Sequence, residues 1–285
     1  MSQHKEQQGF VSFAQNNEHT DYLELARVQA ANIKATQQIN RYAVIVDTET
    51  RQLITEQDSL LFDYVIEIPQ DLAKTQSWKL ANEAQVFWLT PFKETVKLES
   101  DLLFTRSIDH WWQAFRLRDV MLSHGCKNYL QQPSLARRYR QVFDSNGLPD
   151  VYNGLMYFRY SKTAHDFFSL ALKIQQSWPE LQNHLRNCRE DSPSTDVLFA
   201  VTAAVMGPEK CLAPGLDFIN FVHMKPAHNN LPETDKFTDR LFTEFDQGMI
   251  RINHVNQLHP LHYYEKDFVS AEMKEWYGSR VFTSS

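Results

Sequence analysis

The sequence predicts an α/β fold in which helices flank a mostly parallel β-sheet. Three short runs of β-branched and aromatic residues, at 9–14, 42–47 and 64–68, have the composition and length of buried strands. Between the first two runs, apolar residues recur at helical spacing over 21–33, after an acidic capping pattern. Strands that alternate with helices favour parallel pairing through crossover helices.

Two of these strands end in polar residues that could face a ligand. Residues 15–17 directly follow the first predicted strand, and Asp47 ends the second. Open parallel sheets bind their ligands at the carboxyl ends of the strands. We therefore expect a ligand site where these two strand ends meet.

The remaining elements follow from the same two periodicities. Apolar residues at helical spacing predict helices over 78–92, 107–115, 134–143, 164–175, 196–205 and 268–277. Apolar runs rich in β-branched and aromatic residues predict strands over 95–104, 118–123 and 151–160. Asn-Gly-Leu-Pro at 146–149 predicts the turn before the last of these strands.

The chain is expected to form one domain. A length of 285 residues, with 42% hydrophobic and 22% charged residues, suits a single large globular unit. Residues 1–8 are polar and are expected to be disordered, which leaves 9–285 as the domain. From about residue 207 the sequence becomes rich in His, Asn and Pro, so a C-terminal extension is expected there.

The composition disfavours several classes of protein. A formal net charge of −6 argues against a protein that coats nucleic acid through its overall charge, although a local basic patch remains open. The 3 cysteines are widely spaced, which indicates neither a disulfide framework nor a zinc site. The sequence has no signal-peptide pattern and no apolar run of membrane-spanning length. We expect no membrane contact and a cytoplasmic location, in the host cytoplasm if the protein is viral.

Two carboxylates interrupt the apolar run over 95–104. Acidic side chains inside an apolar strand are costly unless something neutralises them. Residues two apart on a strand point the same way, so Glu99 and Asp101 can converge on one cation. Mg²⁺ and Mn²⁺ prefer such oxygen ligands and are often shared with substrate phosphates. The alternative is a strand end whose acids face water or pair with Lys97 and Arg106.

Around these acids, several sequence blocks resemble the GT-A glycosyltransferases, especially the glycogenin-like branch that uses UDP-sugars. Phe-Ala-Gln-Asn-Asn at 13–17, followed by Tyr22, looks like the nucleotide-binding start of that family. Glu-Ser-Asp at 99–101 stands where the family has its Asp-x-Asp motif, with Glu99 departing from the usual Asp. The resemblance implies the GT-A (Rossmann-like) fold, with a mixed, mostly parallel sheet flanked by helices.

Later blocks extend the resemblance to residue 226. Asn-Gly-Leu-Met-Tyr-Phe at 153–158 is similar to the strand that lines the sugar site, but its Asn and Gly are adjacent rather than separated by one residue. Asp196 falls where the family has an acid near the transferred sugar. Phe-Val-His-Met-Lys-Pro at 221–226 looks like the late His and Lys block, with closer spacing than usual. His262 is therefore kept as a substitute for His223.

The resemblance implies a metal-dependent enzyme that moves a hexosyl or pentosyl group from a UDP-sugar to an acceptor hydroxyl, with retention of configuration. Mn²⁺ or Mg²⁺ would be the cofactor. The implied metal ligands are Asp101, His223 and Glu99, and the implied catalytic residues are Asp196 and Asn153. The implied donor contacts are Phe13, Ala14, Asn16, Tyr22, Lys79, Glu99, Ser100, Gly154 and Lys225. Lys79 could instead be a solvated surface residue, and Asp196 the N-cap of the following helix.

The acceptor is left open by the sequence. Arg137, Arg138 and Arg140 lie in the predicted helix 134–143 and could contact the phosphates of double-stranded DNA. An ordinary solvated helix face would look the same. More loosely, the chain resembles bacteriophage enzymes that glycosylate hydroxymethyl bases in DNA.

Three functional hypotheses follow. The acceptor could be the hydroxymethyl group of a modified cytosine in phage DNA. It could instead be a saccharide or a protein. In the third hypothesis the protein binds a nucleotide-sugar without catalysis. The oligomeric state is not predictable from the sequence.

Overall fold

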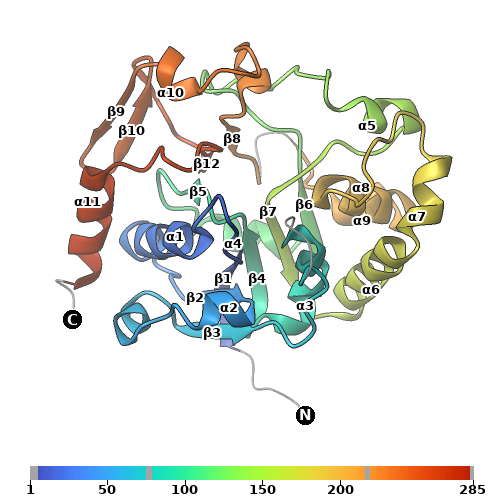
Figure 1. Ribbon diagram of the computed structural model, residues 1–285, viewed down its shortest axis with the longest axis horizontal. Helices are drawn as coiled ribbons and strands as arrows, with labels where there is room; N and C mark the ends of the chain where they lie inside the picture. The colour runs from blue at the N-terminus through green and yellow to red at the C-terminus, as the bar shows by residue number, and fades with distance from the viewer. Residues whose placement is uncertain (1–5, 75–78, 216–218, 283–285) are drawn as a thin grey trace.

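The computed structural model describes residues 6–74, 79–215 and 219–282, and it is built around a 6-stranded sheet (Figure 1). The strand order is β3-β2-β1-β4-β7-β6, in which β1 to β4 pair in parallel and β7 is antiparallel to both β4 and β6. The strands are β1 Glu6–Ala14, β2 Tyr42–Val46, β3 Tyr64–Glu67, β4 Phe92–Leu98, β6 Val120–His124 and β7 Val151–Arg159. The prediction of a mixed, mostly parallel sheet flanked by helices is confirmed.

Helices cover both faces of this sheet (Figure 1). Along β2, Tyr42, Val44 and Val46 belong to the core on one face, whereas Ala43 and Ile45 belong to the core on the other. This alternation explains why the strand is apolar throughout, as is typical of parallel sheets with two covered faces. The first face carries α1 Tyr22–Thr36, α4 Trp111–Phe115 and α11 Ala271–Phe282; the second carries α3 Val86–Leu89, α6 Lys162–Gln176 and α8 Thr195–Met206.

The C-terminal part of the chain returns to the end of β4. Two of its strands, β8 Val222–His223 and β12 Leu261–His262, form a small sheet with β5 Leu102–Leu103. A second small sheet joins β9 Thr243–Asp246, β10 Met249–Ile252 and β11 Val255–Asn256. The final helix α11 packs beside α1, as Figure 1 shows. The C-terminal segment therefore reaches the same sheet edge as the acids that follow β4.

Short elements complete the structure. They are α2 Thr48–Arg51, η1 Glu56–Leu60, η2 Lys79–Gln85, α5 Gln141–Asn146, α7 Trp178–Leu181, η3 Gln182–His184, α9 Pro208–Cys211, η4 Pro226–Asn229 and α10 Phe237–Arg240. None of the helices within the described residues is long and apolar enough to cross a membrane.

Several predicted elements differ from the structure. Disorder over 1–8 is wrong for residues 6–8, which belong to β1, while 1–5 lie outside the described residues. In place of a helix over 78–92 there is the 3₁₀ turn η2, the short α3 and the start of β4; Trp78 lies outside the described residues. The side chain of Asn82 explains the tight turn, because it bonds Gln15, Asp71 and the backbone of residue 72.

The predicted strand over 95–104 is interrupted. β4 ends at Leu98, and the amide of Leu102 donates to the carbonyl of Glu99, which closes a turn before β5. Glu99 and Asp101 therefore lie on a turn rather than on an extended strand. Their convergence results from that turn and not from the period of two that predicted it.

Candidate active site

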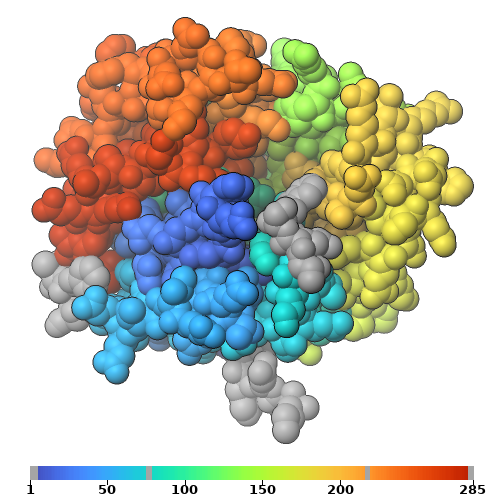
Figure 2. All heavy atoms as spheres, in the orientation of Figure 1, coloured from blue at the N-terminus to red at the C-terminus, as the bar shows by residue number. Residues whose placement is uncertain are grey.

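A cavity of about 280 Å³ opens at the carboxyl ends of β1 and β4. Segments from opposite ends of the chain surround it, and Figure 2 shows the N-terminal and C-terminal segments meeting near the middle of this face. The lining residues are Phe13, Gln15, Asn17, Tyr22, Lys79, Leu80, Glu83, Leu98, Glu99, Ser100, Asp101, His223, Lys225, His262, Tyr264 and Lys266. The cavity thus includes Gln15 and Asn17, at the end of β1 where the sequence predicts a ligand, whereas Asp47 is not among its lining residues and instead caps α2.

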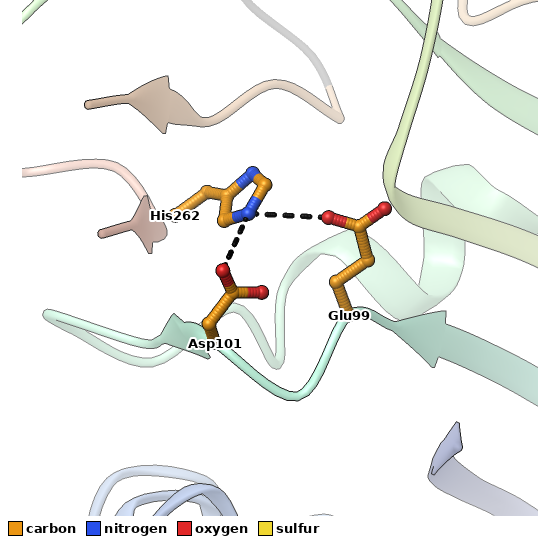
Figure 3. A group of neighbouring side chains, drawn as sticks. All are labelled: Glu99, Asp101 and His262. Carbon is orange, nitrogen blue, oxygen red and sulfur yellow. Dashed lines mark hydrogen bonds and ion pairs between the residues drawn. The ribbon is translucent and has the colours of Figure 1, made fainter. Parts of the chain in front are cut away.

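Glu99, Asp101 and His262 form a group that could hold a metal ion (Figure 3). The Nε2 atom of His262 lies 3.1 Å from Oε2 of Glu99 and 3.0 Å from Oδ2 of Asp101. The acids come from the turn after β4, and the register of β12 places His262 opposite Leu102 of β5. Two carboxylates and one imidazole on a cavity wall suit a divalent ion that is shared with a phosphate-bearing ligand.

Two cationic side chains compensate the buried acids. Burial raises the pKa of the Asp101 carboxyl, but His262 and Lys266 outweigh burial and hold that pKa well below its ordinary value. Burial lowers the pKa of His262, yet the charges of Asp101 and Glu99 reverse this and raise it. The pKa of Glu99 is raised by burial, against the pull of His262. The Nζ atom of Lys266 bonds Asp101 directly.

His223 lies beside this group but outside it. Its ring stacks on the ring of His262, with centroids 4.4 Å apart and planes at 12°. Burial, His262 and His228 hold the pKa of His223 well below its ordinary value. Among the described residues, the group that could hold a metal ion contains His262 and not His223. His262, which the sequence analysis keeps as the alternative to His223, is therefore the histidine that the fold places beside the acids.

The predicted lysines do line the cavity. Lys79 faces it and also donates to the carbonyl of Ala73 at 3.3 Å, so it is not simply a solvated surface residue. Lys225 faces it with Nζ 4.1 Å from the ring centre of Tyr139, and burial lowers its pKa. Together with Lys266, these lysines give the cavity three ammonium groups suited to an anionic ligand.

The residues after β1 divide into lining and supporting groups. Phe13 and Tyr22 line the cavity as predicted, but Ala14 is completely buried in the core and is not among the lining residues. Asn16 also stays out of the lining: its side chain bonds Asp21 and accepts from the amide of residue 23. Asn16 therefore holds the turn that places its neighbours, and Gln15 and Asn17 are the polar residues that face the cavity.

The residues of the 153–158 block on β7 lie next to the cavity rather than in its lining. Ser100 lines it, whereas Asn153, Gly154 and Asp196 do not. Asn153 is 1% exposed, and its backbone amide donates to Oδ1 of Asp196 at 2.7 Å. A Cβ on Gly154 would lie 2.7 Å from the ring of Phe221, so only glycine fits there without displacement.

Asp196 is not the N-cap of its helix. Ser194 is the N-cap of α8, and its side chain accepts from the amide of Val197. The Asp196 carboxylate instead binds Arg140 at 2.7 Å and the backbone of Asn153. Its role in this structure is to fix β7 to the segment before α5.

The predicted basic helix over 134–143 is wrong. Helix α5 starts only at Gln141, and the preceding residues are irregular because their arginines bind acids elsewhere in the fold. Arg140 is 2% exposed and bonds Asp150 and Asp196, and Arg137 bonds Asp150 at 2.6 Å. Of the three predicted nucleic-acid contacts, Arg138 alone is exposed and has no acidic partner within the described residues. The three therefore do not form one basic face.

Replacing Arg140 tests this structural assignment. Arg140→Met removes one partner of a buried ion-pair cluster and leaves Asp196 without its cation, so we expect unfolding to become easier by about 3–5 kcal/mol. Arg138→Met removes an exposed charge and should change stability by less than about 0.5 kcal/mol. Urea unfolding measures both. Equal stabilities for the two variants would contradict the buried role of Arg140.

Two charged lining residues, Glu83 and Lys266, were not predicted from the sequence. Lys266 follows His262 by four positions, a His and Lys pairing that could have indicated it in the way the 221–226 block indicated Lys225. Glu83 has no such signal, because it lies in a segment predicted as an ordinary helix. Its partner Lys97, in the middle of an apolar strand, is the one unusual residue that points to it.

Solved glycosyltransferase structures resemble this chain in fold. It is similar to the galactosyltransferase LgtC in complex with donor and acceptor sugar analogues, with a TM-score of 0.54 and 15% identity over 95% of each chain. An active-site mutant of LgtC gives 0.55 and 15% identity, covering 97% of this chain and 95% of that one. The glycosyltransferase GlyE of Streptococcus pneumoniae gives 0.50 and 9% identity, covering 97% of this chain and 60% of that one.

Sequence comparison adds no closer relative. No protein-family model matches the chain, and a search of curated proteins finds no match. At these identities the likeness concerns the fold. The chain has the mixed α/β fold of GT-A-type glycosyltransferases.

Proposed function

We propose that this protein is a metal-dependent glycosyltransferase that moves a sugar from a UDP-sugar to an acceptor hydroxyl. The observation that carries the proposal is the group of Glu99, Asp101 and His262 on the wall of a cavity at the carboxyl ends of β1 and β4. Two acids that close together at this sheet edge are explained if they hold a cation that binds a diphosphate. The likeness in fold to a galactosyltransferase supports the same conclusion.

The lining residues divide the chemistry among them. A divalent ion at the acid group would stabilise the charge that develops on the leaving diphosphate. Lys79, Lys225 and Lys266 add positive charge on the same cavity and can contact the diphosphate oxygens. Phe13 and Tyr22, beside the end of β1, offer flat apolar surfaces for the nucleotide base. Next to the cavity, the hydrogen bond from the backbone amide of Asn153 to Asp196 holds β7 in place.

For the acceptor, we propose a hydroxyl of a saccharide. The arginines that suggested DNA lose their common face, since Arg140 is buried and Arg137 is paired with Asp144 and Asp150. A saccharide acceptor also agrees with the acceptor sugar analogue bound in the similar LgtC structure. Transfer to hydroxymethylated DNA or to a protein is tested by the same assays, and retention of configuration by NMR of the anomeric proton of the product.

Donor binding and turnover test the proposal directly. We expect UDP to bind about tenfold or more tightly with Mn²⁺ than without it, because an ion held by Glu99, Asp101 and His262 would attract the charged diphosphate. Calorimetry measures the binding, and mass spectrometry of reactions with a panel of UDP-sugars and acceptors measures transfer. UDP binding with no turnover on any donor would favour the non-catalytic alternative. Product on hydroxymethylcytosine DNA but on no saccharide would favour the DNA acceptor.

A further inference from the structure

A lysine lies completely buried in the centre of the main sheet. Lys97 is on β4, with 0% of its surface exposed. Its Nζ atom lies 2.5 Å from Oε2 of Glu83, which is itself 4% exposed. Bringing an ammonium group into a core is costly even when a carboxylate neutralises it, and apolar residues of similar size are often at least as stable. The pair therefore calls for a reason other than stability.

Among the described residues, hydrogen bonds hold the carboxylate of Glu83 through one oxygen only. The Nδ2 atom of Asn153 donates to the same Oε2 atom at 2.6 Å, so two donors fix that oxygen. Asn153 is held in turn, because its backbone amide donates to Asp196. Within the part of the chain that the structure describes, no hydrogen bond to the other oxygen, Oε1, is formed.

The free oxygen belongs to a residue that lines the candidate active site. Glu83 faces the same cavity as Lys79 and the metal group of Glu99, Asp101 and His262. An ionised carboxylate only accepts hydrogen bonds, so its natural partner in a ligand is a hydroxyl or amide donor. A charge-assisted bond from a hydroxyl to such an oxygen is strong and directional. In a UDP-sugar, the transferred sugar is a part that is rich in hydroxyl donors.

We propose that Glu83 is a specificity-determining residue that accepts a hydrogen bond from a hydroxyl of the transferred sugar, and that Lys97 is the positioning residue that holds it. This inference rests on the proposed function and adds the part of the donor that Glu83 recognises. The metal group and the lysines take the diphosphate, and Phe13 and Tyr22 take the base. The sugar, attached to the diphosphate, then contacts the polar lining residues that these groups leave, among which Glu83 is the charged one.

The proposal is tested with the best donor and its monodeoxy analogues. Wild-type enzyme should use one deoxy donor about 10- to 100-fold less efficiently in kcat/KM, because a charged acceptor loses its hydrogen bond. Glu83→Gln should lose a similar factor on the parent donor and no longer distinguish it from that analogue. The affinity for UDP with Mn²⁺ should stay within about twofold, since UDP carries no sugar beyond the diphosphate.

Lys97 is tested in a form that keeps the core neutral. Lys97→Met alone leaves the Glu83 charge buried without a partner, and Glu83→Gln alone leaves the Lys97 charge so, and each single variant is expected to destabilise the fold. The double variant Lys97→Met with Glu83→Gln removes both charges, so it should fold and should show the same loss of donor discrimination as Glu83→Gln. Thermal unfolding and UDP binding serve as controls for both variants.

The possible outcomes distinguish failure of the role proposed for Glu83 from failure of the proposed glycosyltransferase function. Transfer by the wild type, with discrimination among deoxy donors that persists unchanged in Glu83→Gln, would overturn the role of Glu83 alone. Wild-type protein that neither binds UDP nor transfers any sugar would overturn the proposed function itself.

Discussion

Asp101→Ala and His262→Ala are each expected to lower kcat/KM for sugar transfer by about 100- to 1000-fold. Each substitution removes a ligand from the group that would hold the divalent ion, and stabilisation of a developing charge of this kind is worth several kcal/mol. The loss should appear as weaker activation by Mn²⁺ as well as lower turnover. Steady-state kinetics over a range of Mn²⁺ concentrations measures both effects.

His223→Ala is the matched control for His262→Ala. The two imidazoles stack at 4.4 Å, so both substitutions remove a buried ring from the same place, but the Nε2 atom of His262 is the one at 3.0 Å from Asp101. We expect His223→Ala to keep at least about a tenth of wild-type activity and to show nearly normal activation by Mn²⁺, because it removes packing rather than a ligand. A reversed order of the two variants would make His223 the ligand that the 221–226 block indicates.

Local patterns were enough to predict the sheet. The apolar strands β1, β2 and β7 were predicted within a few residues of their ends. Each is buried on both faces of the sheet, and a strand in that environment has a continuous run of apolar residues. The cap of α1 was also predictable, since Asp21 accepts from an amide three residues later. The rule for the carboxyl ends of parallel strands indicated the end of β1, where the cavity opens, but it also indicated Asp47 after β2, which does not line the cavity.

The third member of the metal group could not be assigned from the sequence. His262 and Asp101 are 161 residues apart, and they meet only because β12 pairs with β5. No local pattern specifies that register, since both strands are two residues long. The late block that contains His223 lies on the neighbouring strand β8, one strand further from the acids. Its resemblance to a ligand motif therefore indicated a histidine on β8, whereas the histidine within 3.0 Å of Asp101 lies on β12.

Tertiary ion pairs overrode local propensity in the arginine-rich segment. The sequence over 134–143 has an acceptable helical pattern, yet Arg140 is drawn inward by Asp150 and Asp196. A buried guanidinium must keep these partners, and the backbone around it follows their positions rather than a helix. The partner Asp196 lies 56 residues away, so the sequence alone could not show that this positive charge was already neutralised.

Removing divalent cations is expected to abolish transfer, and Mn²⁺ or Mg²⁺ should restore it where Ca²⁺ does not. The cavity offers two carboxylates and one imidazole, a set that suits a small ion completed by water and phosphate oxygens. Ca²⁺ prefers 6–8 oxygen ligands at longer distances, which this group cannot supply. Turnover after treatment with excess EDTA, followed by addition of each cation in turn, measures the requirement.

The cation series also distinguishes a metal requirement from a structural one. If the ion acts on the diphosphate, the fold should keep its thermal stability in EDTA, because Lys266 and His262 already compensate the acids. Asp101→Ala should then lose a smaller share of its activity on chelation than the wild type, since its ligand set is already incomplete. Full activity of the wild type in EDTA would assign the charge stabilisation to the three lysines of the cavity instead, and the acids would become their ion-pair partners.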